Sequence, residues 1–473
     1  MAQILLFTET NTMGYGKSAG AYRIASELRR QGYTVQVIDN YTQWGKGIIK
    51  QMISKFVSDE TLWMGFSTTF TDKRDGRIAK QWVQRDLVNK MGREDIEHLF
   101  NFAKSINPKL KIVVGGVYAH FLEPYECIDF IINGQGETSI VALTKALEKN
   151  ELFPRVVNDK DYPYNDFTSS TIDWHASDCV FPGEHLPIEI ARGCIFKCKY
   201  CDFDLNGKKP GEYIKNEEVL KAELLRNHEM YNPSGYLVSD DTLNDSPEKV
   251  EMIHRAFTSV PKDLINSAYA RIDLMIRHPK TLDLLYEAGF RSFFFGIETF
   301  SHKAAKFVGK GMHPDEVKRG LEWIKKTYPD ILISAGIIYG LPGETLEEMK
   351  ATNEYLKSSP IDHAAPTVFM LSSASIIGSD PEKFGYTKGA NIRDWVRDDG
   401  LTVEQCDDLV QDAMDGWIRK KNRISWVFAN RVLNCGYSLE DCHNTSVELH
   451  NLEEIKKRAR ELKIKYRDQI LGL

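Results

Sequence analysis

The segment ARGCIFKCKYCDFD, residues 191–204, is the clearest indication of the fold of the second half of the chain. It follows the apolar segment PIEIA at 187–191, which is typical of a buried strand, and it places Cys194, Cys198 and Cys201 in a C-x3-C-x2-C spacing. Three thiolates on one loop can hold three irons of a [4Fe-4S] cluster and leave the fourth iron open. Structural zinc usually takes four protein ligands in paired knuckles, and no second knuckle follows this one. A cluster is therefore favoured over zinc and over a chance grouping of cysteines.

On both sides of this loop, the region from 186 to 375 has a sequence pattern that predicts alternating strands and helices. Strands are predicted at PIEIA, GYLVSDD, INSAYARID, FRSFFFGIE, ILISAGIIYG and APTVFML, with helices at 216–231, after 246–247, and at 281–288, 314–327 and 345–356. Six strands that each lead into a helix or loop predict a partial (β/α)6 barrel of the TIM type. Functional groups are expected at the C-terminal ends of these strands.

The N-terminal residues 1–150 show a second alternation. Apolar runs near residues 2–7, 34–39, 62–67, 111–116 and 128–134 are separated by helical patterns, which predicts a doubly wound, Rossmann-like parallel sheet. Ligands of such sheets lie beyond the C-terminal ends of the strands. Residues 151–185 are rich in Pro, Asp and Tyr and are expected to form a linker.

The residues from 376 to 473 are expected to be mainly helical, with an amphipathic docking helix at the end. Trp395, Trp417 and Trp426 are expected to pack these helices rather than to line a substrate pocket. Cys406, Cys435 and Cys442 are too irregularly spaced for a second cluster, although one of them could face the substrate.

Composition excludes several classes of protein. Of the 473 residues, 42% are apolar and 27% are charged, which is typical of a globular protein rather than a disordered one. The net charge of −6 gives no global attraction to nucleic acid or to an anionic membrane. No long apolar span and no leader pattern are apparent, so a cytoplasmic protein is expected.

The spacing C-x3-C-x-aromatic-C, with Tyr200 as the aromatic residue, resembles the signature of the radical S-adenosylmethionine (SAM) superfamily. The resemblance continues along the barrel in SDDTLND, FFFGIETFS and GIIYGLPGET, the last of which ends in Glu344 and Thr345. It implies contacts with the amino group, the ribose and the adenine of SAM at these successive strand ends. The residues to which it assigns SAM binding are Tyr200, Phe203, Ser239, Asp240, Asp241, Arg271, Glu298, Thr299, Ile338, Gly340 and Pro342. For Arg271, a contact with the SAM carboxylate and a plain ion pair stay open as alternatives.

The chemistry implied by this resemblance follows from the open iron. SAM chelates it, one electron enters the cluster, and the carbon–sulfur bond breaks to give methionine and a 5′-deoxyadenosyl radical, while the protein positions the cofactor and excludes water. His302 and His363 lie near strand ends, but a structural role is expected for both rather than acid–base catalysis.

The N-terminal half also carries a resemblance. The segments KIVVGGVYAHFLEP and IDFIINGQGETSIVAL resemble the cobalamin-binding-type domains that precede some radical SAM barrels. The expected cobalamin-binding residues are Thr12, Gly14, Gly16, Ser67, Thr68, Gly115, Gly116, Gly134, Gly136 and Glu137. The chain lacks the D-x-H-x-x-G motif whose histidine ligates cobalt in methionine-synthase-like domains, so a bound cobalamin would lack that ligand.

The segment NTMGYGKSAG also admits two other interpretations. It has the G-K-S of a P-loop, but Asn11 stands where the first glycine is required. A plain glycine-rich turn before a helix is the simpler alternative.

These features predict a cobalamin-dependent radical SAM methyltransferase that acts on an unactivated carbon of a small molecule or peptide. It would require an external one-electron donor of the flavodoxin or ferredoxin type. One alternative is a radical SAM enzyme without cobalamin that catalyses a cyclisation, a rearrangement or a sulfur insertion. Another is an iron–sulfur scaffold or sensor without enzymatic activity.

Overall fold

The computed structural model describes residues 1–9, 14–41, 44–68, 93–116, 119–123, 125–203, 205–414, 432–443 and 449–473. These residues form two compact units. The first unit contains Met1–Pro187, Glu229–Asn232 and Ile455–Leu473, and the second contains Ile188–His228 and Pro233–Glu454.

The first unit is built on a parallel sheet with the strand order β2-β1-β3-β4-β5-β6. Its strands are β1 (Ile4–Phe7), β2 (Val35–Ile38), β3 (Trp63–Ser67), β4 (Lys111–Gly115), β5 (Phe130–Asn133) and β6 (Val156–Asn158). Every residue of β1 and β2 is buried, as expected for strands that are covered on both faces. The predicted doubly wound sheet is thus confirmed.

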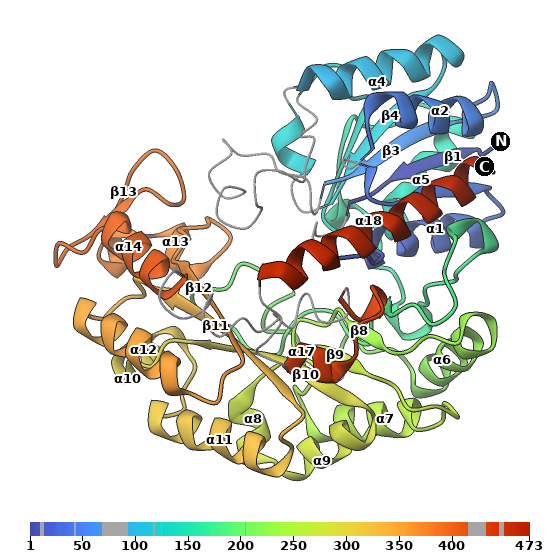
Figure 1. Ribbon diagram of the computed structural model, residues 1–473. Helices are drawn as coiled ribbons and strands as arrows, with labels where there is room; N and C mark the ends of the chain where they lie inside the picture. Colours follow the sequence, from blue (N-terminus) through green and yellow to red (C-terminus); the bar gives the residue numbers. More distant parts are fainter. Residues whose placement is uncertain are drawn as a thin grey trace. The chain divides into compact units, whose positions relative to one another are not determined.

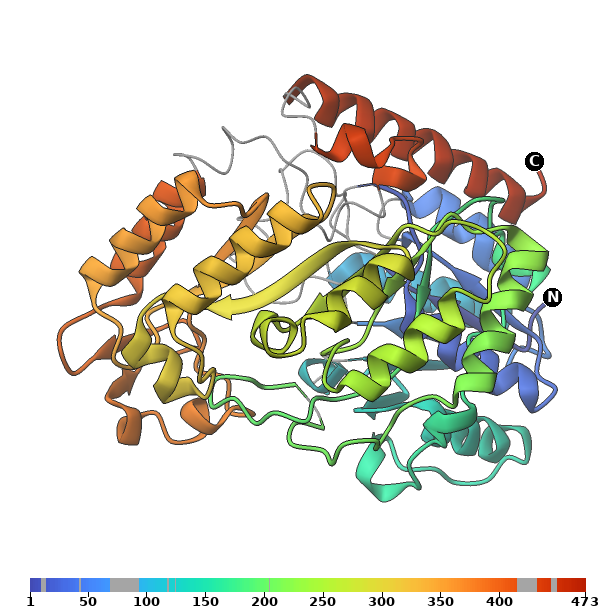
Figure 2. The same ribbon diagram turned by 90° about the horizontal axis from the view of Figure 1, so that it is seen from below.

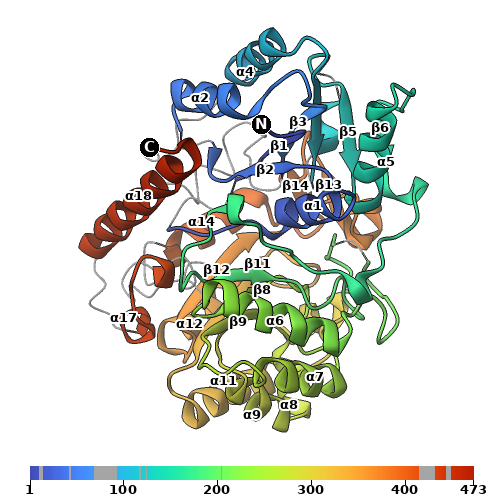
Figure 3. The same cartoon turned by 90° about the vertical axis from the view of Figure 1, so that its right-hand side faces the viewer.

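Helices cover both faces of this sheet (Figures 1 and 3). Helices α1 (Ala19–Arg30) and α5 (Glu137–Glu148) pack together on one face, and α2 (Lys46–Phe56) and α4 (Arg93–Ile106) pack together on the other. The segment expected to be a linker contributes β6, the edge strand of the sheet. Its Val156 and Val157 pair with Ile131 and Ile132 of β5, a contact that the Pro-rich composition of the segment does not reveal.

The C-terminal helix α18 (Leu449–Leu471) returns to the first unit with its residues from 455 onward (Figure 2). The Tyr466 hydroxyl accepts a hydrogen bond from the backbone N–H of Asp39 at 3.0 Å, just beyond the end of β2. Tyr466 is fully buried, which anchors the helix as the amphipathic pattern predicts.

The second unit is built on a six-stranded sheet with the order β12-β11-β10-β9-β8-β7. Its strands are β7 (Leu186–Ile188), β8 (Tyr236–Val238), β9 (Asn266–Ala270), β10 (Phe290–Glu298), β11 (Leu332–Tyr339) and β12 (His363–Val368). The pairings from β8 to β12 are all parallel.

The connecting helices lie along the outer side of this sheet (Figure 1). They are α6 (Glu217–Tyr231), α7 (Pro247–Phe257), α8 (Ile272–Arg277), α9 (Lys280–Glu287), α10 (His302–Val308), α11 (Pro314–Thr327) and α12 (Leu346–Ser358). The predicted partial (β/α)6 barrel is confirmed, and it places the C-terminal ends of its strands on one side.

After the barrel the chain forms α13 (Ile376–Ser379), α14 (Val403–Ala413) and α17 (Leu439–His443), as the helical prediction requires. It also forms an antiparallel hairpin of β13 (Tyr386–Lys388) and β14 (Trp395–Arg397), which the sequence analysis missed. Strand β14 alternates in burial, because Trp395 and Arg397 are buried and Val396 is exposed. Trp395 is buried and packs edge-on against Tyr386, whereas Trp417 and Trp426 lie outside the described residues. None of the described helices is long and apolar enough to span a membrane.

Candidate functional site

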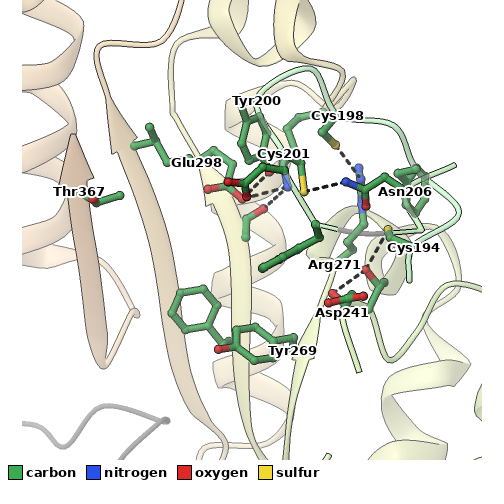
Figure 4. Close-up of a pocket in the computed structure, with 18 of the residues that line it drawn as sticks. Cys194, Cys198, Tyr200, Cys201, Asn206, Asp241, Tyr269, Arg271, Glu298 and Thr367 are labelled. Atoms are coloured by element: carbon green, nitrogen blue, oxygen red, sulfur yellow. Dashed lines mark hydrogen bonds and ion pairs between the residues drawn. The ribbon is translucent and has the colours of Figure 1, made fainter. Parts of the chain in front are cut away.

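A cavity of about 300 Å³ opens at the C-terminal ends of the barrel strands in the second unit (Figure 4). All three clustered cysteines line it, together with side chains from the ends of β9 to β12 and from the loops that follow β8 and α10. Of the residues expected to bind SAM, Tyr200, Phe203, Asp241, Arg271, Glu298 and Ile338 line this cavity, and the other five do not.

The cysteine loop is folded back on itself by backbone hydrogen bonds. The N–H of Cys194 donates to the Leu205 carbonyl, and the N–H of Gly207 donates to the Cys194 carbonyl at 2.8 Å. Gly193 has a φ of +72°, and a Cβ at this position would lie 2.5 Å from Leu205 Cβ. Only glycine fits this conformation without displacing the returning chain. The tight loop therefore holds the sulfurs at the cavity wall.

Each sulfur has a polar neighbour, as Figure 4 shows. Asn206 Nδ2 lies 3.2 Å from Cys201 Sγ, and Arg271 Nη1 lies 3.7 Å from Cys198 Sγ. Burial raises the pKa of the Cys201 thiol, whereas the Asn206 donor lowers it by favouring the thiolate. Among the described residues, no three His, Cys, Asp or Glu side chains converge as the ligands of a single metal ion would.

The two aspartates of the SDD segment after β8 have different surroundings: Asp240 makes buried structural contacts, and Asp241 lines the cavity. Asp240 is buried, accepts the backbone N–H groups of Ile190 and Ala191, and forms an ion pair with Lys249 at 2.9 Å. Asp241 lines the cavity, accepts the N–H of Gly193 at 2.9 Å, and has its pKa raised to about 6, mainly by burial. Ser239 is exposed and does not line the cavity. Asp241 is thus the carboxylate available to a ligand.

Glu298 ends β10 in a backbone conformation that is unusual for a residue with a side chain. Its φ is +69°, and the register of β10 against β11 shifts between Gly296 and Glu298. Tyr200 donates a hydrogen bond to Glu298 Oε1, and Lys310 Nζ lies 3.2 Å from the same oxygen. Lys310 also donates to the Gly296 carbonyl at 2.7 Å. The contacts with Tyr200 and Lys310 hold the Glu298 carboxylate at the cavity wall, on a backbone in a sparsely populated conformation.

Behind this wall lies a layer of buried residues that support the strand ends. Thr299 donates a short hydrogen bond to Glu344, and burial raises the pKa of Glu344 to about 8. Gly340 has a φ of +90°, and a Cβ there would lie 2.6 Å from the ring of Trp395. Pro342 is buried in the same turn. Of the β11 segment, only Ile338 lines the cavity.

The side of the cavity formed by β9, β10 and β12 is largely apolar and aromatic. Tyr269 and Phe294 pack edge-on with their ring centroids 5.3 Å apart, and Phe369 and Met370 follow β12. Tyr269 is 39% exposed and Met370 is 38% exposed, so both present surface to an incoming molecule. Thr367 adds a single hydroxyl to this surface.

In the first unit, seven of the ten expected cobalamin-binding residues, namely Ser67, Thr68, Gly115, Gly116, Gly134, Gly136 and Glu137, lie at or just after the C-terminal ends of β3, β4 and β5. The N–H of Thr68 donates to the Gly115 carbonyl at 2.7 Å, which ties two of these ends together. Gly116 and Gly134 have positive φ values of 102° and 81°. At Gly134, a Cβ would lie 2.3 Å from the carboxylate of Asp159, so this glycine is needed for packing within the unit. Gly136 directly precedes α5.

Further predicted residues of this unit have mixed outcomes. Glu137 is buried and lies 3.8 Å from Arg23, which gives this side chain an internal ion pair. Gly14 has a φ of +90° and Gly16 is buried, and both precede α1. Thr12 lies outside the described residues.

The lysine of the P-loop-like G-K-S segment is committed to the interior of the first unit. Lys17 Nζ donates to the Asp178 carbonyl at 2.9 Å and pairs with Asp39 at 3.5 Å. The Tyr466 ring lies 4.7 Å from the same ammonium group. Lys17 therefore contacts helix α18 through Tyr466 and the segment before the barrel through Asp178. These contacts give it a structural role instead of the phosphate-binding role of a P-loop lysine.

The remaining candidates have structural environments. Burial lowers the pKa of His363 to about 4, and the His302 ring packs on His313. Cys406, Cys435 and Cys442 are buried, and none lines the cavity.

Sequence reasoning missed five polar residues of the cavity, namely Asp202, Asn206, Thr242, Lys310 and Thr367. Lys310 stands between Gly309 and Gly311, both at positive φ, and this G-K-G pattern was a usable signal. Asn206 and Thr242 had no signal beyond their closeness to Cys201 and Asp241.

Comparisons with known proteins agree with this geometry. Residues 188–356 match the model of the Radical SAM superfamily. An uncharacterised methyltransferase of Pyrococcus horikoshii is 26% identical over 291 residues, which cover 56% of this chain and 62% of that protein. The anaerobic magnesium-protoporphyrin IX monomethyl ester cyclase of Rubrivivax gelatinosus is 23% identical over 295 residues, which cover 54% of this chain and 50% of the cyclase. The chain thus spans about half to three-fifths of these relatives.

Among solved structures, the radical SAM methyltransferase TsrM of Kitasatospora setae, determined with cobalamin and a [4Fe-4S] cluster bound, aligns with a TM-score of 0.65. The alignment covers 98% of this chain and 100% of TsrM at 14% identity. At this identity the likeness concerns the fold.

Proposed function

Because residues 188–356 match the model of the Radical SAM superfamily, we propose that this chain is a cobalamin-dependent methyltransferase acting on carbon. The observation that carries the proposal is that the three cysteine sulfurs line one cavity together with two carboxylates. These are Asp241, which a ligand can reach, and Glu298, which Tyr200 and Lys310 hold in place. The match to the Radical SAM model supports a radical SAM enzyme over the scaffold or sensor alternative, and with it a [4Fe-4S] cluster and SAM. The methyl transfer, the cobalamin and the residue roles below belong to the proposal.

The donor set fits these groups. Cys194, Cys198 and Cys201 are free thiols at one cavity wall, and they are the ligands a cluster with one open iron requires. When bound, the cluster and SAM supply a 5′-deoxyadenosyl radical and cobalamin supplies a methyl carrier. The part of this chain is to bind, to orient and to exclude water.

Two carboxylates and one apolar side chain would orient SAM. Asp241 would accept a charge-assisted hydrogen bond from the ammonium group, which would also lower its raised pKa again. Glu298, held by Tyr200 and Lys310, would accept hydrogen bonds from the ribose hydroxyls. Ile338 would pack beside the adenine ring.

Cobalamin binding is supported by the first unit. Its doubly wound sheet ends in small residues at Ser67, Thr68, Gly115 and Gly116, and small residues let a bulky ligand approach the backbone. The TsrM fold, determined with cobalamin bound, is similar across nearly the whole chain. Glu137 and Gly134 contribute through packing rather than as direct contacts.

The aromatic side of the cavity favours a substrate with an apolar portion, either a small molecule or a peptide side chain. Tyr269, Phe294 and Met370 would cover this portion and exclude water from the reacting carbon. An external one-electron carrier of the flavodoxin or ferredoxin type would reduce the cluster. The similarity to an anaerobic ester cyclase keeps ring formation without methyl transfer as the second candidate.

One experiment separates these functions. The protein is purified anaerobically and reconstituted with iron, sulfide and hydroxocobalamin, and its corrin absorption is recorded after gel filtration. Turnover mixtures are then analysed by mass spectrometry. Retained corrin with S-adenosylhomocysteine and a product heavier by one methylene supports the methyltransferase. Formation of 5′-deoxyadenosine with no retained corrin and no S-adenosylhomocysteine supports the cyclase-like alternative.

A further inference from the structure

Each sulfur of the cysteine trio has its own hydrogen-bonding neighbour, and the three neighbours come from different segments. Asn206 belongs to the returning arm of the cysteine loop, Thr242 to the loop after β8, and Arg271 to the end of β9. Asn206 Nδ2 is 3.2 Å from Cys201 Sγ, Thr242 Oγ1 is 3.2 Å from Cys194 Sγ, and Arg271 Nη1 is 3.7 Å from Cys198 Sγ. Figure 4 labels Arg271 and Asn206, the partners of Cys198 and Cys201, and marks their contacts with dashed lines.

The Arg271 guanidinium is fixed on two sides. It forms two parallel hydrogen bonds with Asp273, from Nε at 2.9 Å and from Nη2 at 2.8 Å. Its central carbon lies 3.7 Å from the Phe196 ring centroid. Asp273 thus occupies Nε and Nη2 of the guanidinium, and the remaining nitrogen, Nη1, donates to Cys198 Sγ. Of the two alternatives for Arg271, the ion pair is present in the structure, with Asp273, and Arg271 also lines the cavity.

Asn206 is fixed through the backbone beside it. Cys194 and Asn206 form an isolated parallel bridge, and the flanking hydrogen bonds join Cys194 to Leu205 and Gly207. These contacts fix the backbone of Asn206 beside the loop that carries the ligands, and they place its side-chain amide next to Cys201. This placement makes its N–H a preformed donor.

Thr242 is a weaker donor because its single proton is shared. Its hydroxyl also lies 2.8 Å from the Asp241 carbonyl oxygen, to which it can donate instead. We expect its contribution to be the smallest of the three.

We propose that Asn206 and Arg271, with a smaller contribution from Thr242, set the reduction potential of the cluster held by the three cysteines. A cluster gains one negative charge when it accepts one electron, and part of that charge resides on the cysteine sulfurs. Donors to these sulfurs stabilise the reduced state and raise the potential, as hydrogen bonds to sulfur do in iron–sulfur proteins generally. The proposal needs only the cluster and does not rest on methyl transfer.

The test is a redox titration with dithionite, followed by electron paramagnetic resonance, on reconstituted full-length protein without SAM or cobalamin. Asn206→Asp keeps the shape of the side chain but replaces the donor by an anion. At a fixed potential, we expect the ratio of reduced to oxidised cluster to fall by at least about tenfold. For a one-electron couple, this corresponds to a lowering of the reduction potential by ~59 mV. Arg271→Gln should shift the ratio in the same direction, and Thr242→Val should shift it least.

Asn216→Asp is the matched control, because it adds the same charge at an exposed position before α6 and should leave the ratio unchanged. The neutral variant Asn206→Ala covers the case in which the aspartate variant does not retain iron. Unchanged potentials in Asn206→Ala and Arg271→Gln at full iron content would overturn the proposal. Failure of methylation in the wild-type protein would not affect this result.

Discussion

The hydroxyl of Tyr200 donates a hydrogen bond of 2.8 Å to Oε1 of Glu298, which joins the cysteine loop to the end of β10 (Figure 4). The two residues are 98 positions apart in the chain, and Glu298 holds a left-handed backbone conformation. Burial, followed by the charge of Glu298, raises the pKa of the Tyr200 phenol, so it stays a donor at neutral pH. The bond therefore couples the position of the cluster ligands to the position of the proposed ribose contact.

Replacing this carboxylate tests its role in binding SAM. Glu298→Gln keeps the size of the side chain but weakens each hydrogen bond it accepts, because the acceptor is no longer charged. We expect SAM affinity to fall by roughly tenfold to a hundredfold, measured by calorimetric titration of reconstituted protein. Tyr200→Phe keeps the carboxylate and should cost less, about fivefold. Equal affinity in Glu298→Gln and wild type would remove Glu298 from the proposed site.

SAM affinity should depend on pH through Asp241. Its pKa is raised to about 6, mainly by burial, and only the ionised form attracts an ammonium group. Affinity should therefore rise by about fourfold from pH 5.5 to 7.5 and then level off. Asp241→Asn should bind SAM weakly with a flat profile over this range. A sloping profile in that variant would assign the titration to another group.

The stability of the fold should depend on pH through Glu344. Its pKa is raised from 4.5 to about 8, and burial is the main cause. Between these values the folded state keeps a proton that the unfolded chain has lost, so stability falls as pH rises through this window. The wild type should lose on the order of a few kcal/mol between pH 5 and 8 relative to Glu344→Gln. Thermal unfolding of both proteins across this range measures the difference, and parallel curves would contradict it.

The turn after β11 should tolerate no side chain at Gly340. Its φ of +90° is unfavourable for alanine. An alanine Cβ at this position would also clash with the Trp395 ring, at a distance of 2.6 Å. Gly211 has a φ of +84° with nothing within 4 Å, so Gly211→Ala carries the backbone strain alone. We expect about 1 kcal/mol of destabilisation for Gly211→Ala and about 1–3 kcal/mol more for Gly340→Ala. Equal melting temperatures for the two variants would show that Trp395 does not confine the turn.

The sequence predicts both sheets because their strands are apolar throughout and are separated by helices of regular period. It predicts the cysteine site because three thiols within eight residues are rare by chance. It does not separate Asp240 from Asp241, because adjacent carboxylates look alike until the backbone directs one toward Lys249 and the other toward the cavity.

The parts that the sequence did not predict depend on long-range contacts. Strands β6, β13 and β14 have three residues each, and, unlike the equally short β7 and β8, they do not lie in a region that alternates apolar runs with helical patterns. Asn206 has no sequence signal, because it reaches Cys201 only when the cysteine loop folds back on itself. Lys310 does have one, the G-K-G pattern, which the prediction did not use.

The most direct measurement of the central claim is the iron and sulfide content of anaerobically reconstituted protein, with 5′-deoxyadenosine formed from SAM under dithionite. The wild type should hold about four irons and four sulfides per chain and should release 5′-deoxyadenosine. Alanine at Cys194, Cys198 or Cys201 should abolish its release, whereas Cys127→Ser, at a half-buried cysteine outside the cavity, should match the wild type. Undiminished release of 5′-deoxyadenosine from any of the three alanine variants would contradict the account.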